Sequence, residues 1–192
     1  MANINEKFGL RPYRSINGAP WNNAQNRYTV ANNLSTAIFQ GDPVKPTTAG
    51  NVTLARSNTS DRIIGVFNGV FYNDPTTQKP TFRNNYPGSI AAAGITAFVV
   101  DDPNTVFLVD ANAAFTRADL FRNYSLTNVS GNTLTGISEK QLAVNTSGIQ
   151  TTFAVQAIDI QEGATDSDTS TSGVNVLVRI NNHFFRSGTA GI

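Results

Sequence analysis

The chain has 192 residues, of which 40% are hydrophobic and only 14% are charged, and its formal net charge is +1. This length can bury one sizeable core, or one core and a small lobe, while Asn, Thr, Ser and Gln must carry the polar surface. Because the Lys and Arg residues are scattered, no basic run exists that would neutralise several phosphates together, and nucleic-acid binding is disfavoured.

The first residues after Met1 form a polar run that lacks the apolar core of a secretory signal. Nowhere does an apolar stretch approach the ~18 residues that suggest a membrane span. We therefore expect a protein that is made in a cytoplasm and has no membrane partner.

Residues 1–24 are predicted to form an extended N-terminal arm. Large apolar side chains alternate there with Arg, Gly and Pro without a helical or strand period, and Pro12 and Pro20 favour an extended backbone. Fixing the backbone costs roughly 1–2 kcal/mol per residue, whereas each buried anchor returns ~1.5–3 kcal/mol, so these anchors do not order the segment alone. Docking on a neighbouring chain, packing on its own domain and fraying are the alternatives. The candidate interface residues are Phe8, Leu10, Arg11, Tyr13, Arg14 and Trp21.

Residues 25–192 are predicted to form the body, a single mainly β domain of the barrel or sandwich type. Short β-branched or aromatic runs separated by Gly, Pro, Asn and Asp are typical of strands joined by turns. One short helix is expected within Asp110–Asn123, where Thr116 and Asp119 have the spacing of a helix cap. The expected strands are Arg27–Val30, Thr36–Gln40, Val52–Ala55, Ile63–Tyr72, Thr81–Asn84, Ile95–Val100, Thr105–Asp110, Thr133–Ile137, Thr151–Ile160 and Val174–His183.

Two short segments have the chemistry of tight turns. In residues 74–77 and 101–104, Pro follows Asp at a position where its fixed φ suits a type I turn. Each segment lies between two expected strands, and we predict a hairpin at each.

The last two long strands indicate where the core lies. One face of the final strand is apolar, with Leu177 as the exception on the other face; its members are Val174, Val176, Val178 and Ile180. In the preceding strand Val155 and Ala157 alternate with Gln156, whereas Ile158 and Ile160 fall on the second face. This pattern favours a strand covered on both sides at one end. The polar run 162–173 between these strands is expected to be an exposed, mobile loop.

A search for catalytic or metal-binding residues finds no supported arrangement. Cys is absent, no phosphate loop or nucleophile elbow is present, and His183 has no recognisable nucleophile or orienting carboxylate. Four closely spaced carboxylates do not have the ligand spacing of a calcium loop, which favours a solvated loop over opportunistic cation binding; they are Asp159, Glu162, Asp166 and Asp168. We predict no catalytic residues, cofactor or metal, and no enzyme activity, with glycoside hydrolysis by paired carboxylates as a remote alternative.

Aromatic residues gather around the first predicted hairpin. They are Phe67, Phe71, Tyr72, Phe82 and Tyr86. Aromatic residues on a β-scaffold are mostly cross-strand and core partners, and we favour that interpretation. Use in an interface and stacking on a glycan are the alternatives.

Three segments of the first half resemble virion proteins of tailed bacteriophages, often from phages of aquatic bacteria and including cyanophages. They are Phe8-Gly-Leu-Arg-Pro with Gly18-Ala-Pro-Trp, Ile38-Phe-Gln-Gly-Asp-Pro-Val, and Ile64-Gly-Val-Phe-Asn-Gly-Val-Phe-Tyr with Tyr86-Pro-Gly. The members are usually taken to be capsid decoration or cement proteins. The second half is similar only in its general β-character.

The resemblance implies a structural virion protein that binds the outside of the assembled capsid and bridges capsomers. It implies the major capsid protein as partner and a homo-oligomer, a trimer, on the capsid surface. An extended arm would then cross to neighbouring subunits. The alternative function is a head-fibre or tail component that binds a receptor or glycan through the aromatic hairpin and the 162–173 loop.

Overall fold

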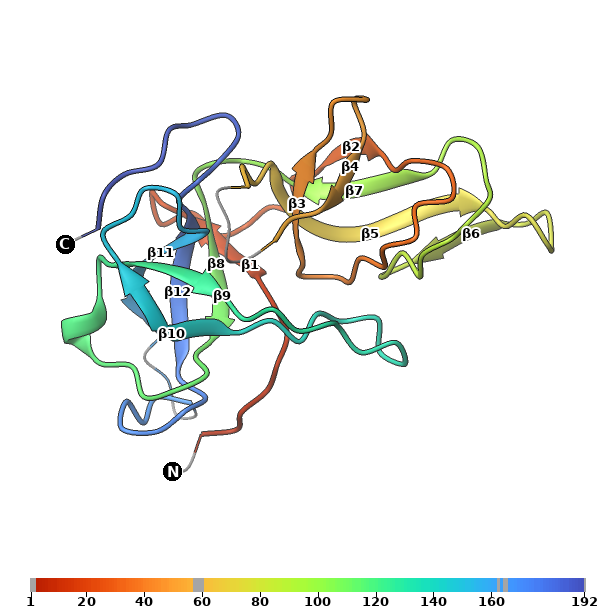
Figure 1. Cartoon of the computed structure of the whole chain (residues 1–192). Helices are drawn as coiled ribbons and strands as arrows, with labels where there is room; N and C mark the ends of the chain where they lie inside the picture. Colours follow the sequence, from red (N-terminus) through yellow and green to blue (C-terminus); the bar gives the residue numbers. More distant parts are fainter. Residues whose placement is uncertain (1–2, 57–60, 162, 164–165, 192) are drawn as a thin grey trace.

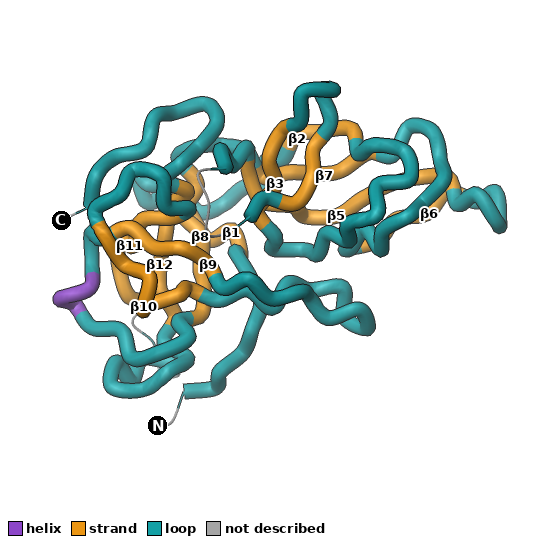
Figure 2. The backbone as a smooth tube through the Cα atoms, viewed as in Figure 1, coloured by secondary structure: helices purple, strands orange, loops and turns teal. Residues whose placement is uncertain are grey.

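A computed structural model describes residues 3–56, 61–161, 163 and 166–191, and it is mainly β, with 40% strand and 2% helix. The strands form two antiparallel sheets, which lie side by side as two lobes (Figure 1). Long loops connect the strands within and between the lobes (Figure 2). Among the described strands, neither sheet closes into a barrel.

Sheet A has six strands in the order β1-β8-β12-β11-β9-β10. Its strands are β1 (Arg11–Ser15), β8 (Thr105–Asp110), β9 (Asn123–Leu126), β10 (Leu142–Gly148), β11 (Val155–Ile160) and β12 (Asn175–Ile180). One face holds the larger apolar core, which includes the predicted core face of the last strand, Val174, Val176, Val178 and Ile180. That prediction is confirmed, and the exception Leu177 packs with Phe8, Val106 and Leu108 on the opposite face.

A bulge in β11 corrects one detail of the predicted strand. The register with β12 shifts between Ala157 and Asp159, which returns Ile160 to the core face of Val155 and Ala157. Ile158 packs against the apolar cluster on the other face. Apolar groups therefore cover β11 on both sides, as expected, but Ile158 and Ile160 do not share a face.

Sheet B forms the second lobe around its own core. It has the order β2-β7-β5-β3-β4, with β6 paired to β5 outside this path. The strands are β2 (Asn26–Thr29), β3 (Pro43–Pro46), β4 (Val52–Leu54), β5 (Gly65–Asn73), β6 (Pro80–Arg83) and β7 (Thr96–Val100). Phe67, Tyr72 and Tyr86 are buried in this core. Each sheet thus has its own main apolar cluster, although Val66 of β5 and Val100 of β7 join the larger core of sheet A.

One predicted hairpin is confirmed and the other is wrong. Residues 74–77 connect β5 to its antiparallel partner β6, and the Asp74 carboxylate accepts hydrogen bonds from the N–H groups of Thr76 and Thr77 at 2.8 and 2.9 Å. At 101–104 the turn also forms, with Asn104 N donating to Asp102 Oδ1 at 2.8 Å. However, β7 belongs to sheet B and β8 to sheet A, so this turn is the crossover between lobes.

Other strands differ from the prediction because pairing with distant segments decides where a strand forms. Thr36–Gln40 and Thr133–Ile137 contain only isolated bridges, at Ile38, Gln40 and Ile137, whereas β1, β3, β9 and β10 were not expected. The short helix is confirmed as a single 3-10 turn, η1 (Arg117–Asp119). Its cap is the predicted pair, because the N–H and Oγ1 of Thr116 both donate to Asp119 Oδ2, at 3.0 and 2.8 Å.

The two lobes meet where residues 8–10, 40–42 and 138–140 cross. Leu10 N donates to Gly41 O at 2.9 Å, and Gly9 N donates to Lys140 O at 3.2 Å. The buried Asp42 carboxylate accepts hydrogen bonds from Ser138 Oγ at 2.7 Å and from Phe39 N at 2.9 Å. Burial raises the pKa of Asp42, and these two hydrogen bonds and Lys140 oppose that rise. This polar joint connects the N-terminal segment to both sheets.

Candidate interaction surfaces

The central part of the predicted N-terminal arm is built into sheet A. Residues 11–15 form β1, which pairs antiparallel with β8, and Leu10 is only 1% exposed in the larger core. Phe8 is also buried, against Leu108 and Leu177. The structure therefore corrects the expectation that Phe8 and Leu10 are anchors for a neighbouring chain. Both side chains pack on their own domain, which was one of the alternatives. The ladder with β8 supplies the backbone hydrogen bonds that order the segment, which the side-chain estimate alone omitted.

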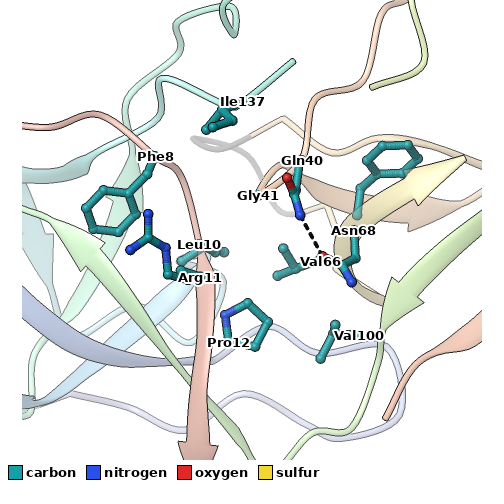
Figure 3. A pocket seen from close by; sticks show the side chains of 11 residues that line it. Phe8, Leu10, Arg11, Pro12, Gln40, Gly41, Val66, Asn68, Val100 and Ile137 are labelled. Carbon is teal, nitrogen blue, oxygen red and sulfur yellow. Dashed lines mark hydrogen bonds between the residues drawn. The ribbon is translucent and has the colours of Figure 1, made fainter. Parts of the chain in front are cut away.

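Arg11 and Pro12 lie beside a small cavity between the lobes (Figure 3). Leu10 and Pro12 lie on one side of the cavity, and Val66 and Val100 lie opposite. The Arg11 guanidinium stacks on the Phe8 ring, 4.5 Å from its centroid. The cavity measures about 100 Å³, which is well below the roughly 300–1,000 Å³ of typical ligand sites. We therefore assign it to the joint between the lobes.

Tyr13, Arg14 and Trp21 have different surroundings. Trp21 is half-buried against the larger core, whereas Tyr13 and the neighbouring Ile16 are 43% and 46% exposed. Tyr13 and Arg14 line an open trough of about 430 Å³, here called the β1 trough, together with Arg117, Asp159, Ile160, Gln161 and Leu177. Of the six predicted interface residues, Tyr13 and Arg14 thus remain available at this surface.

The aromatic residues around the first hairpin divide between two faces of sheet B. Phe67, Tyr72 and Tyr86 are in the core, as favoured from the sequence. Phe71 and Phe82 lie on the outer face, where their ring centroids are 4.6 Å apart, and Phe82 is 72% exposed.

Sequence reasoning missed two further members of this outer surface. Phe98 stacks with Phe82 at a centroid distance of 6.2 Å and an interplanar angle of 19°, and the guanidinium of Arg27 lies 6.0 Å from the Phe98 centroid. We call Arg27, Phe71, Phe82 and Phe98 the aromatic face. Strand alternation could have placed Phe98 on the outer face, because it lies between the core residues Ala97 and Val99.

The titratable candidates have structural surroundings. His183 is fully buried, its Nδ1 accepts the N–H of Phe185 at 3.1 Å, and burial lowers its pKa to about 4. Asp101 accepts hydrogen bonds from Tyr28 Oη at 2.6 Å and from Asn26 Nδ2 at 3.0 Å. The Asp101 contacts therefore connect β2 to the residue that follows β7, whereas the His183 contact lies within its own turn.

The described part of the 162–173 loop is in contact with the N-terminal segment. Asn3 Nδ2 donates to Asp168 O at 2.8 Å, and Ile4 N donates to Asp166 Oδ1 at 2.6 Å. Glu162 lies outside the residues that the structure describes. Within the described ranges, no group of three or more His, Cys, Asp or Glu residues is placed to hold a metal ion.

No family model, no curated protein and no solved structure matches this chain in comparisons with known proteins. Searching the described residues for a helix long and apolar enough to cross a membrane also finds none.

Proposed function

We propose that this chain is a non-enzymatic structural protein of a tailed-phage virion that binds the outside of the assembled capsid and stabilises it by bridging capsomers. The major capsid protein is its proposed partner, and a homo-oligomer, a trimer, is its proposed state on the capsid surface. The resemblance of residues 8–21, 38–44 and 64–88 to decoration proteins supports this role. For the body we propose two lobes, each built from one sheet that packs its inner face on an apolar cluster.

The observation that carries the proposal is the exposed end of the N-terminal segment. Tyr13 and Ile16 remain 43% and 46% exposed although Phe8 and Leu10 of the same segment are buried, and Arg14 borders the β1 trough beside Tyr13. Aromatic and Arg side chains are the groups most enriched at the centres of protein interfaces. The low charge of the chain suits a surface that lies against other subunits.

A protein of this kind acts by linkage. If it binds the expanded shell more tightly than loose subunits, it stabilises the shell in proportion to its occupancy. Several weak contacts on one shell also act at high effective concentration once the first is made. Weak binding sites such as the β1 trough are then sufficient for stable attachment.

The proposal is tested with purified protein and shells of the phage that encodes it. We expect the protein to co-sediment with expanded shells and to raise their disassembly temperature. The variant Tyr13→Ser, Arg14→Gln, Ile16→Ser should bind at least about tenfold more weakly. A matched control, Phe121→Ser with Ile149→Ser, changes side chains that are 51% and 63% exposed outside the N-terminal segment and should bind normally. Failure of the unmodified protein to co-sediment would contradict the capsid role, and normal binding of the triple variant would exclude the β1 trough.

A further inference from the structure

The aromatic face crosses four strands of sheet B in register. Arg27 on β2 is opposite Phe98 on β7, Phe98 is opposite Gly69 on β5, and Phe71 on β5 is opposite Phe82 on β6. The rings of Phe82 and Phe98 are nearly parallel, and Phe82 is 72% exposed. Because the core of sheet B lies on its other face, these rings form an apolar surface outside the core of that lobe.

A trough runs along this surface because Gly69 has no side chain opposite Phe98. The strand bulges between Phe67 and Gly69, and the open trough measures about 560 Å³. That volume is within the range of sites for small molecules. Its walls include the rings of Phe82 and Phe98 and the side chains of Arg27 and Arg83.

Three amide side chains complete the lining and are held in place by hydrogen bonds. Asn68 Nδ2 donates to Gln25 Oε1 at 2.7 Å, and Asn68 Oδ1 accepts from Gln40 Nε2 at 3.0 Å. Asn84 Nδ2 donates to Thr135 O at 2.6 Å. The amides of Gln25, Asn68 and Asn84 are therefore fixed in orientation before any ligand arrives, which lowers the entropic cost of binding.

The charge of the trough has one sign. Its described lining contains Arg27 and Arg83 and no Asp or Glu. Neither guanidinium forms a salt bridge within the described part of the chain. Arg presents a planar fork that binds a carboxylate through two parallel hydrogen bonds, so an anionic ligand complements this site.

We propose that this trough binds an acidic oligosaccharide. The apolar C–H face of a sugar ring stacks on Phe82 and Phe98, its hydroxyls pair with the amides, and its carboxylate pairs with Arg27 or Arg83. A purely apolar polypeptide segment would bury these polar groups without partners, which is costly. A nucleic acid would find only two cations where binding needs several phosphate contacts. The site is separate from the β1 trough and does not depend on attachment to a capsid.

The test is calorimetric titration of the full chain with a panel of uronate- and sialate-containing tetrasaccharides and their neutral counterparts. We expect at least one acidic tetrasaccharide to bind at least tenfold more tightly than its neutral counterpart, and more weakly as salt increases. Phe82→Ala and the double variant Arg27→Gln, Arg83→Gln should each weaken binding at least tenfold. Phe121→Ala and Arg62→Gln, which change another exposed Phe and another exposed Arg, should leave binding unchanged.

Three results would overturn the proposal. The first is that no acidic tetrasaccharide binds more tightly than its neutral counterpart. The second is that binding persists unchanged in Phe82→Ala or in the double arginine variant. The third is that tetraglutamate binds through Phe82 more tightly than any saccharide, which would identify an acidic polypeptide as the ligand. Because no shell is present in these titrations, their outcome is independent of the capsid-binding experiment.

Discussion

Gly9 and Gly41 pack backbone against backbone at the joint between the lobes. Leu10 N donates to Gly41 O at 2.9 Å. A Cβ atom on Gly9 would lie 2.6 Å from Gly41 O, and one on Gly41 would lie 2.6 Å from Phe8 O. Both residues also have positive φ, at 68° and 94°. Two segments far apart in the sequence, Phe8-Gly-Leu-Arg-Pro and Gln40-Gly-Asp-Pro, therefore meet in space.

Substituting either glycine at this joint should destabilise the protein. Gly9→Ala and Gly41→Ala combine backbone strain with a clash against main-chain atoms, and each should lower the free energy of unfolding by about 2–4 kcal/mol. Gly18→Ala is the matched control, because Gly18 also has positive φ, at 89°, but no atom within 4 Å of the added Cβ; its cost should be about 1 kcal/mol. Urea unfolding measures all three variants. Equal losses for Gly9→Ala and Gly18→Ala would contradict the role of close packing.

Local chemistry predicted turns from the sequence but not their partners. Asp74 and Asp102 both accept hydrogen bonds from the backbone N–H two residues later, as the Asp-Pro pattern predicts. Whether the next strand pairs with the previous one depends on contacts far along the chain. Val106 pairs with Arg179 in β12, for which the local pattern contains no signal. For this reason the 74–77 hairpin was predictable and the 101–104 crossover was not.

The candidate surfaces were predictable only in part. Alternation identified the core face of β12 because the larger apolar core covers that face along its whole length. It did not separate Phe71 from Tyr72 in β5, because the bulge at Gly69 and the position of β6 decide which face is exposed. For the N-terminal segment, the comparison of backbone ordering with side-chain burial did not include the backbone hydrogen bonds between β1 and β8.

Substitutions of Leu10 and Tyr13 should affect different properties: the first should lower stability and the second should weaken binding. Leu10→Ala leaves a cavity in the larger core and should cost about 2–5 kcal/mol of stability. Tyr13→Ser changes an exposed side chain and should alter stability by no more than about 0.5 kcal/mol, while weakening attachment to shells. Thermal unfolding and co-sedimentation separate the two effects. A large loss of stability in Tyr13→Ser would show that this residue belongs to the core and not to a docking surface.

Deleting residues 1–24 should unfold sheet A. The boundary expected from the sequence, an arm over 1–24 and a body over 25–192, implies that the body folds without the arm, but β1 and Leu10 are part of the sheet and its core. We expect the truncated protein to lose cooperative unfolding and the β-sheet signal of that lobe in circular dichroism. A truncated protein that unfolds at the same urea concentration as the full chain would restore the hypothesis of a free arm.

Asp110 should make the protein less stable as pH rises. The carboxyl is 1% exposed, and burial raises its pKa from 3.8 to about 6, with Asp166 acting in the same direction and a hydrogen bond from Gln141 opposing them. Between about pH 4 and pH 6 the folded state holds a proton that the unfolded chain has released, so stability falls as pH rises through this window.

Asp110→Asn removes this ionisation and keeps an oxygen that can accept the hydrogen bond from Gln141. The variant should therefore be more stable than the unmodified protein by about 2 kcal/mol near pH 7, with the difference shrinking towards about pH 4. Urea titrations across this range measure the difference directly. A difference that stays constant with pH would mean that Asp110 does not titrate in the folded state.

His183 should make the protein less stable as pH falls, which is the opposite of the effect of Asp110, over nearly the same pH range. Burial is the largest cause that lowers its pKa from 6.5 to about 4, and Arg186 adds to it. As pH falls from about 6.5 to 4, the unfolded chain binds a proton that the folded state excludes, so stability is lost. His183→Asn can retain an acceptor for the Phe185 N–H, which donates to Nδ1 at 3.1 Å, without the titrating ring.

Separating the two groups requires both variants. The Asp110→Asn variant lacks the titration of Asp110 and so shows the effect of His183 alone. From about pH 7 to pH 4 its free energy of unfolding should fall by about 2–3 kcal/mol more than that of the double variant Asp110→Asn, His183→Asn. Urea unfolding at several pH values gives this difference. Parallel curves for the single and double variants would mean that His183 is protonated equally in the folded and unfolded states, and that its burial does not control the acid stability of the protein.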